Sequence, residues 1–244
     1  MNDDCLYGDA RPCVSTLHIF KKGFSFAVDG PGNRLVYHLR GCNFRCPWCA
    51  NPECFIPIEG PGTPVADILK EAEQARPLCI AGGGVTFTGG EPTCQFEALR
   101  CALEGLKARG VHTCVESNAA HPDLPALFPL IDLLILDCKH HDSALHRRWT
   151  GRGNEQVLAN IKAAADAGVN LLVRIPLIGG VNASDEDAAA FAALFKSLGD
   201  FPVELLRYHE FGKPKWIQQG LEYTMRGAEV SPEQAKRFEE ILKK

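Results

Sequence analysis

Short apolar runs recur along the chain and alternate with segments whose apolar residues stand three or four positions apart. Several runs are continuous and carry β-branched residues, as strands buried on both faces of a parallel sheet do. The pattern predicts six strands, at residues 34–40, 85–88, 111–116, 133–139, 170–175 and 202–208. Between these strands, the apolar residues are spaced as in helices that have one apolar face.

The helical segments combine an apolar face with end signals. In one of them, Phe96, Leu99, Leu103 and Leu106 share a face, and Gly110 follows as a stop. Other apolar faces are formed by Val65, Ile68, Leu69 and Ala72, by Val157, Ile161 and Ala164, and by Phe191, Leu194, Phe195 and Leu198. The expected N-terminal caps are Thr63 before Pro64, Ser184, and Ser231 in the capping-box sequence 231–234, and the other expected stops are Gly168 and Gly199.

The alternation amounts to about six strand–helix units without an internal repeat or a linker. Such alternation predicts a parallel sheet covered by helices. Right-handed crossovers can build either an open doubly wound sheet or a partial barrel, and periodicity does not choose between them. Ligands bind at the carboxyl ends of the strands in both architectures, so the chemistry is expected there.

Composition narrows the function classes. The formal net charge is −4 with both signs interspersed, so no basic field attracts nucleic acid, and no nucleic-acid partner is expected. The first twenty residues hold no long apolar run, which predicts neither a signal peptide nor a membrane span. We therefore expect a cytoplasmic protein without a membrane partner.

The eleven cysteines are many for a cytosolic protein, in which disulfides rarely persist. Cys42, Cys46, Cys49 and Cys54 crowd into one short stretch, whereas structural zinc sites usually use two separated cysteine pairs or add histidines. Three thiolates suit an iron–sulfur cluster that keeps one iron open. A zinc or electron-transfer site that uses Cys54 as a fourth ligand is the non-enzymatic alternative.

Other predicted strands also end in residues capable of ligand binding. Gly89 and Gly90 let a backbone approach a ligand closely, and Glu91 beside them can pair with an ammonium group. The later strands carry charged or polar residues at Asp137, Lys139, Arg174 and His209. A structural ion pair or a surface histidine explains each of these residues equally well when it is considered alone.

The motifs in combination resemble a known family. Cys42-x3-Cys46-x-Trp48-Cys49 looks like the radical S-adenosylmethionine signature. The sequence is further identified as a member of the glycyl-radical-enzyme activating family by residues 26–32, 82–92, Asp137-x-Lys139 and 208–215. The resemblance covers residues 18–244, which predicts a radical S-adenosylmethionine domain over that range and an N-terminal extension at residues 1–17 without an assigned role.

The resemblance implies a partial (β/α)6 barrel that holds a [4Fe–4S] cluster on Cys42, Cys46 and Cys49. S-adenosylmethionine would chelate the fourth iron. Its amino group would be received by Gly89, Gly90 and Glu91, and its adenine would lie beside Trp48 and Ala50. Its ribose and carboxylate would be held by Asp137, Lys139 and His209, with Arg174 nearby. No amino-acid side chain is expected to act as a catalytic base, because the cofactor supplies the chemistry.

In this family, one-electron cleavage of the cofactor gives methionine and a 5′-deoxyadenosyl radical, which abstracts a hydrogen from a glycine Cα of a partner enzyme. The implied partners are a glycyl radical enzyme of anaerobic metabolism, such as pyruvate formate-lyase, and a flavodoxin or ferredoxin as the electron donor. The protein itself is expected to be a monomer.

Several departures from the family pattern bear on this assignment. Ala50-Asn51 stands where relatives often have His-Asn, and Trp48 where tyrosine is common, but neither change removes a cluster ligand. Residues 50–81 contain only Cys54 and Cys79 and leave no room for the cluster-bearing insertion of many relatives. Residues 116–118 could form part of a cation or cofactor-edge site. A radical enzyme that acts on a small molecule or nucleotide remains the enzymatic alternative.

Overall fold

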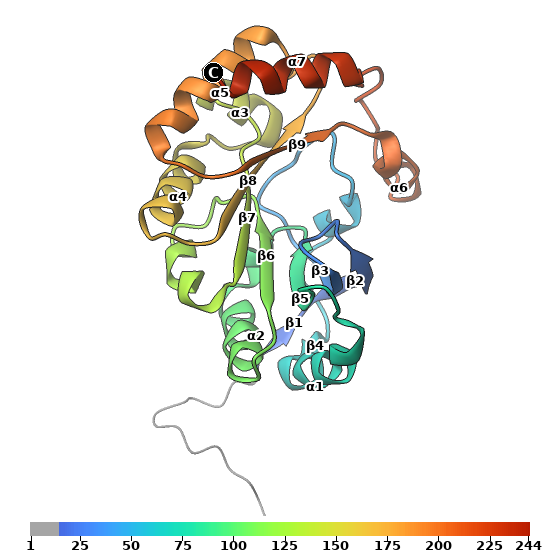
Figure 1. The fold of residues 1–244 in the computed structure, drawn as a ribbon. Coiled ribbons are helices and arrows are strands. Elements are labelled where there is room, and N and C mark those ends of the chain that lie inside the picture. Colours follow the sequence, from blue (N-terminus) through green and yellow to red (C-terminus); the bar gives the residue numbers. More distant parts are fainter. Residues whose placement is uncertain (1–14) are drawn as a thin grey trace, which may run out of the picture.

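The computed structural model describes residues 15–244, and its centre is a seven-stranded sheet (Figure 1). The strands follow one another across the sheet in the order β2, β3, β5, β6, β7, β8, β9. They span Ile19–Phe26, Asn33–Leu39, Val85–Gly89, Thr113–Ser117, Leu133–Asp137, Leu171–Leu177 and Val203–Arg207. The strands from β3 to β9 are parallel and match the six predicted strands, while β2 pairs antiparallel with β3.

Helices connect the parallel strands. The α-helices are α1 (Val65–Ala75), α2 (Phe96–Ala108), α3 (Ser143–Thr150), α4 (Glu155–Asp166), α5 (Asp185–Leu198), α6 (Lys213–Gln218) and α7 (Pro232–Leu242). Short 3₁₀ helices are η1 (Pro52–Phe55), η2 (Arg76–Leu78), η3 (Pro92–Gln95), η4 (Leu124–Leu130) and η5 (Glu210–Gly212). No helix in the described range is long and apolar enough to cross a bilayer.

Helix ends follow the predicted signals with one correction. Ser184 and Asp187 form a complete capping box at α5, and Ser231 accepts a hydrogen bond from the Gln234 amide at α7. The predicted cap at Thr63 is wrong, because Thr63–Pro64 is the short strand β4 and α1 begins one residue later. β4 pairs with β1 (Thr16–Leu17), a pairing between segments distant in sequence that helical spacing cannot reveal.

Most of the predicted N-terminal extension (residues 1–17) lies outside the described range, which begins at residue 15. Its last residues contribute β1, and Leu17 is completely buried against the domain. The domain boundary at residue 17 stays a prediction.

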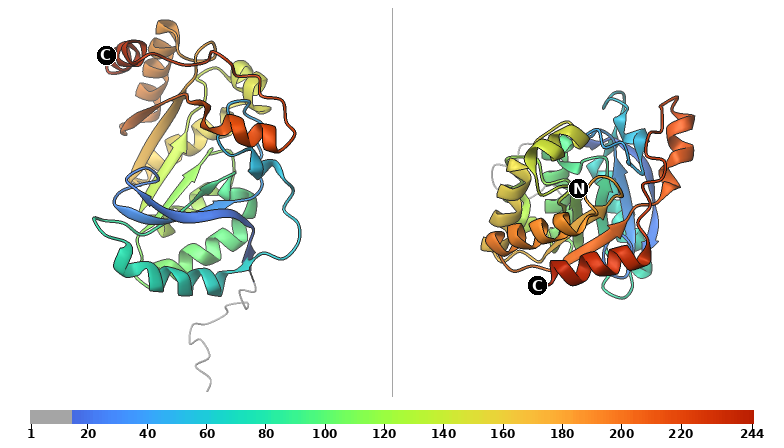
Figure 2. Two further views of the ribbon diagram at one scale, coloured as in Figure 1. Left: turned by 90° about the vertical axis from the view of Figure 1, so that its right-hand side faces the viewer. Right: turned by 90° about the horizontal axis from the view of Figure 1, so that it is seen from above.

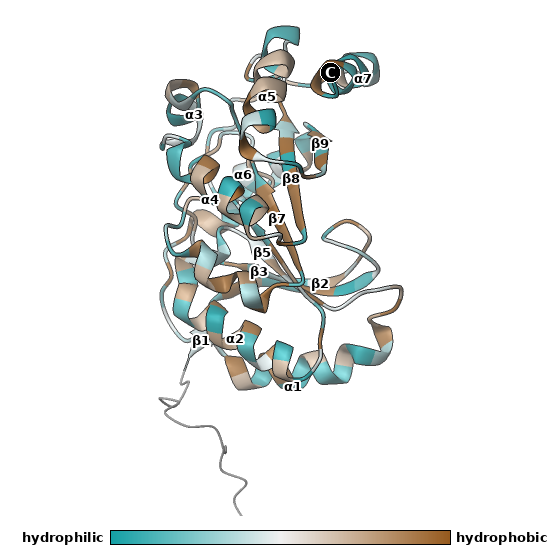
Figure 3. Cartoon of the chain, turned by 60° about the vertical axis from the view of Figure 1, so that its left-hand side comes forward, coloured by the Kyte–Doolittle hydropathy of each residue, from teal (hydrophilic) through white to brown (hydrophobic). Residues whose placement is uncertain are grey.

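The main core lies between the sheet and its helices. Apolar side chains of the strands and of the helix faces that cover them form one continuous buried cluster. Figure 3 shows the apolar colour concentrated along β7 and β8, with polar residues spread over the helices. The helical faces predicted from Leu99, Leu103 and Leu106 and from Val157 and Ile161 are all completely buried, as their spacing requires.

Two of the elements that lacked a sequence signal are β2 and α3. The sequence of β2 is IFKKGFSF. Most of its residues are exposed, so the strand does not need a continuous apolar run and has none. α3 reads SALHRRWT and buries only His146 and Thr150, so its apolar periodicity is weak. Both elements matter for function because β2 leads to the loop at residues 27–32, and α3 packs on the cysteine loop.

The sheet curves without closing (Figure 2). β2 and β9 stand at its two ends, and no strand of the described part of the chain joins them. One hydrogen bond spans the open side, because Nη2 of Arg174 on β8 donates to the carbonyl of Val28, in the loop after β2, at 3.0 Å. The six parallel strands therefore form a partial barrel whose interior is reached from the carboxyl ends.

Candidate active site

A cavity of about 520 Å³ opens at the carboxyl ends of the parallel strands. Its volume lies within the range typical of small-molecule sites. All predicted site residues except Glu91 line it: Cys42, Cys46, Trp48, Cys49, Ala50, Gly89, Gly90, Asp137, Lys139, Arg174 and His209. These residues come from segments up to 167 positions apart, and the fold brings them to one place, as the strand-end rule predicts.

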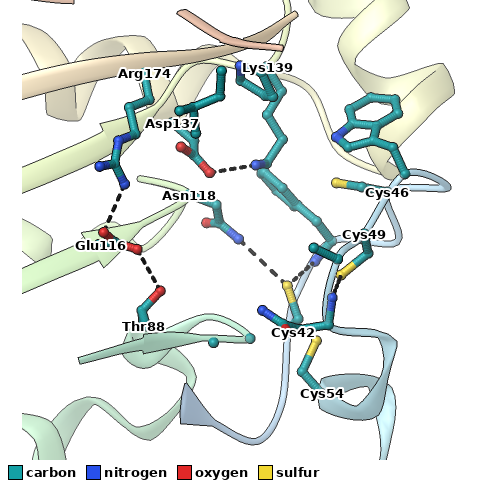
Figure 4. A pocket seen from close by; sticks show the side chains of 18 of the residues that line it. Cys42, Cys46, Cys49, Cys54, Thr88, Glu116, Asn118, Asp137, Lys139 and Arg174 are labelled. Atoms are coloured by element: carbon teal, nitrogen blue, oxygen red, sulfur yellow. Dashed lines mark hydrogen bonds and ion pairs between the residues drawn. The ribbon is translucent and has the colours of Figure 1, made fainter. Parts of the chain in front are cut away.

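The cysteine loop, residues 41–54, follows β3 and forms one wall of the cavity (Figure 4). Gly41 turns the chain at a φ of +83°, a conformation that favours glycine. The loop closes on itself where the Gly41 amide donates to the Cys54 carbonyl at 2.9 Å. The loop is therefore a compact unit attached to the sheet.

Helix α6 supports this loop from outside. Trp216 Nε1 donates to the Cys49 carbonyl at 2.8 Å, and Lys215 Nζ donates to the Ala50 carbonyl at 3.0 Å. A Cβ added at Gly212, just before α6, would lie 2.6 Å from the Cys49 oxygen. The absence of a side chain at Gly212 therefore permits this close packing.

The four thiols of the loop are free, but their surroundings differ. Burial raises the pKa of the Cys46 thiol to about 12. Hydrogen bonding by the Cys54 thiol lowers the pKa of Cys42 and of Cys49 and raises the pKa of Cys54 itself. Cys54 thus acts as a hydrogen-bond donor toward its neighbours and favours the thiolate form of Cys42 and Cys49.

The loop thiols do not converge as the ligands of one ion do. In the described range, His140, His141 and Asp187 place three ligand atoms within 4.8 Å of one another, and no three loop thiols do so. The thiolates of a single zinc ion lie closer than that, since Zn–S bonds are about 2.3 Å long. The loop is therefore not arranged for a single zinc ion.

The glycine pair at the end of β5 forms a second wall. A Cβ at Gly89, whose φ is +109°, would meet the His38 backbone at 2.6 Å, and one at Gly90 would meet the Gly41 oxygen at 2.1 Å. Both positions therefore require glycine. They hold the end of β5 against the start of the cysteine loop and leave their own backbone facing the cavity.

Glu91 lies behind this wall and is completely buried. Its carboxylate accepts hydrogen bonds from the amide and hydroxyl of Thr93, the hydroxyl of Ser117 and the amide of Asn118, at 2.6–3.0 Å. Burial raises its pKa, and these hydrogen bonds oppose the shift. In this structure Glu91 therefore ties the ends of β5 and β6 together.

Two ion pairs charge the far side of the cavity (Figure 4). Lys139 Nζ lies 2.7 Å from Asp137 Oδ2, and although burial lowers the lysine pKa, the carboxylate more than compensates and raises it. Arg174 contacts Glu116 at 2.8 Å and Glu204 at 2.5 Å. Burial raises the pKa of Glu116 to about 7 in spite of the attraction of Arg174.

Sequence comparisons place the chain in a family. A model of the Radical SAM superfamily matches residues 36–192. Pyruvate formate-lyase 1-activating enzyme of Escherichia coli (strain K12) is 33% identical over 234 residues, which cover 93% of this chain and 94% of that protein. The chain belongs to the radical SAM superfamily and, within it, to the pyruvate formate-lyase activating enzymes.

Solved structures agree with this membership. A domain of pyruvate-formate lyase-activating enzyme from Bacteroides vulgatus ATCC 8482 matches with a TM-score of 0.55 at 31% identity, covering 66% of this chain and 94% of that one. A radical SAM methyltransferase from Sphaerobacter thermophilus shares the fold, with a TM-score of 0.65 at 20% identity over 90% of this chain and 65% of that one. The family, fold type and enzyme class expected from the sequence are confirmed.

This radical SAM enzyme also has contacts near the cavity that the sequence analysis did not predict. Asn118 Nδ2 lies 2.6 Å from Asn43 Oδ1 and 3.9 Å from Cys42 Sγ, which links β6 to the cysteine loop. Thr88 donates to Glu116 at 2.8 Å. Thr88 and Asn118 lie at strand ends, so the strand-end rule could have identified them. Glu204 lies inside β9, and only its contact with Arg174 in the folded structure reveals it.

Proposed function

We propose that this enzyme uses a [4Fe–4S] cluster and S-adenosylmethionine to install a glycyl radical on a partner enzyme such as pyruvate formate-lyase. One observation carries the proposal: three free thiols on a braced loop face the same cavity as a glycine wall and two ion pairs. A zinc or electron-transfer module needs only the thiols, whereas a site for S-adenosylmethionine needs the thiols, the glycine wall and the ion pairs together.

Cys42, Cys46 and Cys49 would hold the cluster, and their free thiols on one loop facing the cavity fit it. When bound, the cluster and S-adenosylmethionine supply one-electron cleavage of the sulfonium and abstraction of a hydrogen atom. The backbone of Gly89 and Gly90 would receive the methionine amino group. Glu91 would orient that wall, since its carboxylate is engaged by Thr93, Ser117 and Asn118.

The other residues predicted to contact S-adenosylmethionine line the same cavity. Trp48 and Ala50 are assigned to the adenine, Asp137, Lys139 and His209 to the ribose and carboxylate, and Arg174 to their vicinity. Lys139 is almost enclosed and remains a cation because Asp137 compensates its burial, so it can attract a carboxylate. The walls position the reactants and exclude water and competing hydrogen donors, which is the main task of the protein in radical chemistry.

The proposal extends to partners and compartment. The partner glycine would enter where Val28, Asp29 and Leu206 line the open side of the cavity. A flavodoxin or ferredoxin would supply the electron to the monomeric enzyme. A cytoplasmic location is proposed because the cluster ligands must stay reduced thiols.

The decisive test is anaerobic incubation of the reconstituted enzyme with reductant, S-adenosylmethionine and purified pyruvate formate-lyase. We expect a glycyl signal by electron paramagnetic resonance, with methionine and 5′-deoxyadenosine as products. Cofactor cleavage without a glycyl signal from any tested glycyl radical enzyme would favour the alternative of a small-molecule or nucleotide substrate.

A further inference from the structure

Four arginines gather where α3 meets the cysteine loop. Arg147 and Arg148 lie on α3, Arg152 follows it, and Arg45 lies between the first two loop cysteines; all four are exposed. None of them has a carboxylate oxygen within 4.0 Å among residues 15–244. We call Arg45, Arg147, Arg148 and Arg152 the basic surface.

Direct contacts join the basic surface to the cysteine loop. The Arg45 amide donates to the Thr150 carbonyl, the last residue of α3, at 2.9 Å. The rings of Phe44 and His146 meet edge to face with centroids 5.2 Å apart, and those of Trp48 and Trp149 lie 6.2 Å apart. Residues of α3 therefore pack against Phe44, Arg45 and Trp48, the loop residues that flank Cys46, so the arginines belong to segments in direct contact with the cysteine loop.

The stability of α3 explains the presence of only some of these arginines. Cations in the last turn of a helix interact favourably with its dipole, which suits Arg147 and Arg148. Arg45 and Arg152 lie outside the helix, and Arg45 Nη1 donates to the Cys42 and Phe44 carbonyls at 2.6 and 2.8 Å, which fixes its charge over the loop. The basic surface also contrasts with a chain whose formal net charge is −4.

The opposite end of the cavity has the other sign. Asp29 and Glu204 line it there, and Glu204 is paired with Arg174, whose Nη2 donates to the Val28 carbonyl. An acidic protein is thus attracted to the cysteine end and finds no such attraction at the open side. Complementary charge of this kind steers association and orients the partner.

We propose that the basic surface docks an acidic one-electron carrier protein, a flavodoxin or ferredoxin, which reduces the cluster through the cysteine loop. The inference rests on the proposed function and adds the place of electron entry. In the step, the carrier loses one electron and the cluster gains one, and no atom or proton is transferred. Because electron transfer slows steeply with distance, docking beside the thiol loop is the favourable geometry, and it leaves the open side free for the glycyl radical enzyme.

A charge-reversal variant and a matched control test this surface. The variant carries Arg147→Glu, Arg148→Glu and Arg152→Glu and leaves Arg45 in place, because Arg45 supports the loop. The control carries Lys196→Glu, Lys236→Glu and Lys244→Glu, three exposed lysines of α5, α7 and the C-terminus without ion pairs in the described range. Both proteins change by the same charge, so a general effect of net charge acts on both equally.

Binding is the first measurement. Oxidised flavodoxin is titrated into the iron-loaded enzyme at low and at moderate salt, with calorimetry as the readout. We expect binding weaker by at least about tenfold in the arginine variant, with little remaining salt dependence, and nearly unchanged binding in the lysine control. Equal weakening in both proteins, or none in the arginine variant, would overturn the proposal.

The second measurement separates electron entry from the chemistry. With dithionite as reductant, the arginine variant should cleave S-adenosylmethionine and form the glycyl radical at the wild-type rate, while with reduced flavodoxin both reactions slow. If the dithionite-driven glycyl signal is also lost, the surface binds the glycyl radical enzyme and the docking proposal is wrong. If the wild-type enzyme cleaves no cofactor with dithionite, the proposed function fails, and the binding contrast still decides the docking of an acidic carrier.

Discussion

Cys46 and Cys54 are both buried cysteines of the same loop, but they have different neighbours. Burial raises the pKa of Cys46, so its thiolate is favourable when a cation such as iron binds it. Cys54 donates a hydrogen bond toward Cys42 and Cys49 and stays protonated. The structure thus gives Cys54 a supporting position, where the sequence alone showed a fourth equivalent thiol.

We predict that Cys46→Ser abolishes the cluster and the cleavage of S-adenosylmethionine, while Cys54→Ser retains most of both, since a serine hydroxyl still donates a hydrogen bond. Iron content, visible absorbance and chromatography of 5′-deoxyadenosine measure the outcome. Cys94→Ser, at an exposed cysteine, is the control. Loss of the cluster in the Cys54 variant would show that Cys54 is a ligand.

Glu116 gives a prediction on pH. Its pKa is raised by burial from 4.5 to about 7, so the stabilisation linked to its proton is complete below about pH 4.5 and is lost as the pH rises through about 7. Glu116→Gln should remove this component, which is of the order of 3 kcal/mol. Urea unfolding at several pH values measures it, and an unchanged pH slope in the variant would contradict it.

The short helix α6 supports the cysteine loop through single hydrogen bonds to its backbone. Its sequence has few helical signals, and only the contacts of Lys215 and Trp216 with loop carbonyls reveal its role. The longer helices behave differently, because their apolar spacing alone determines the face they bury. Elements with a core-facing stripe could be predicted from sequence, and elements that act through single backbone contacts could not.

Gly212→Ala tests the bracing by α6. The new Cβ would lie 2.6 Å from the Cys49 oxygen, so the loop must shift, at a cost of about 1–3 kcal/mol and with lower iron occupancy. Gly23→Ala is the matched control, because a Cβ there meets nothing within 4 Å. Thermal unfolding and iron analysis compare the two variants. Equal behaviour would mean that the loop tolerates displacement.

On the scale of the whole molecule, the open sheet gives the cavity two ends with different tasks. The cysteine end is covered by α3 and α6, and the other end is bordered by the loop at residues 27–32 and by β9. This division predicts that reductive cofactor cleavage and activation of the partner can be separated by mutation.

Val28 offers that separation. The residue is 68% exposed at the rim of the cavity, so Val28→Asp adds a charge without opening the core. We expect cofactor cleavage within about twofold of wild type and glycyl radical formation reduced by at least about tenfold, because an apolar contact with the partner is replaced by an unpaired charge. Leu78→Asp, 54% exposed and away from the cavity lining, should leave both reactions unchanged. A parallel fall of both reactions in the Val28 variant would argue against a separate partner site.

The six parallel strands, the long helices and the strand ends where the chemistry lies could all be predicted from the sequence, because apolar spacing and end signals are local properties of the chain. The sequence also determined which cysteines form the compact triplet. The tertiary structure decided what local patterns cannot contain. Glu91 points to Ser117 and Asn118 because strand order makes β5 and β6 neighbours. Arg174 on β8 pairs with Glu116 on β6 and with Glu204 on β9, and α3 contacts the cysteine loop through the Thr150 carbonyl. These contacts join residues far apart in the chain, so only the folded sheet could bring them together.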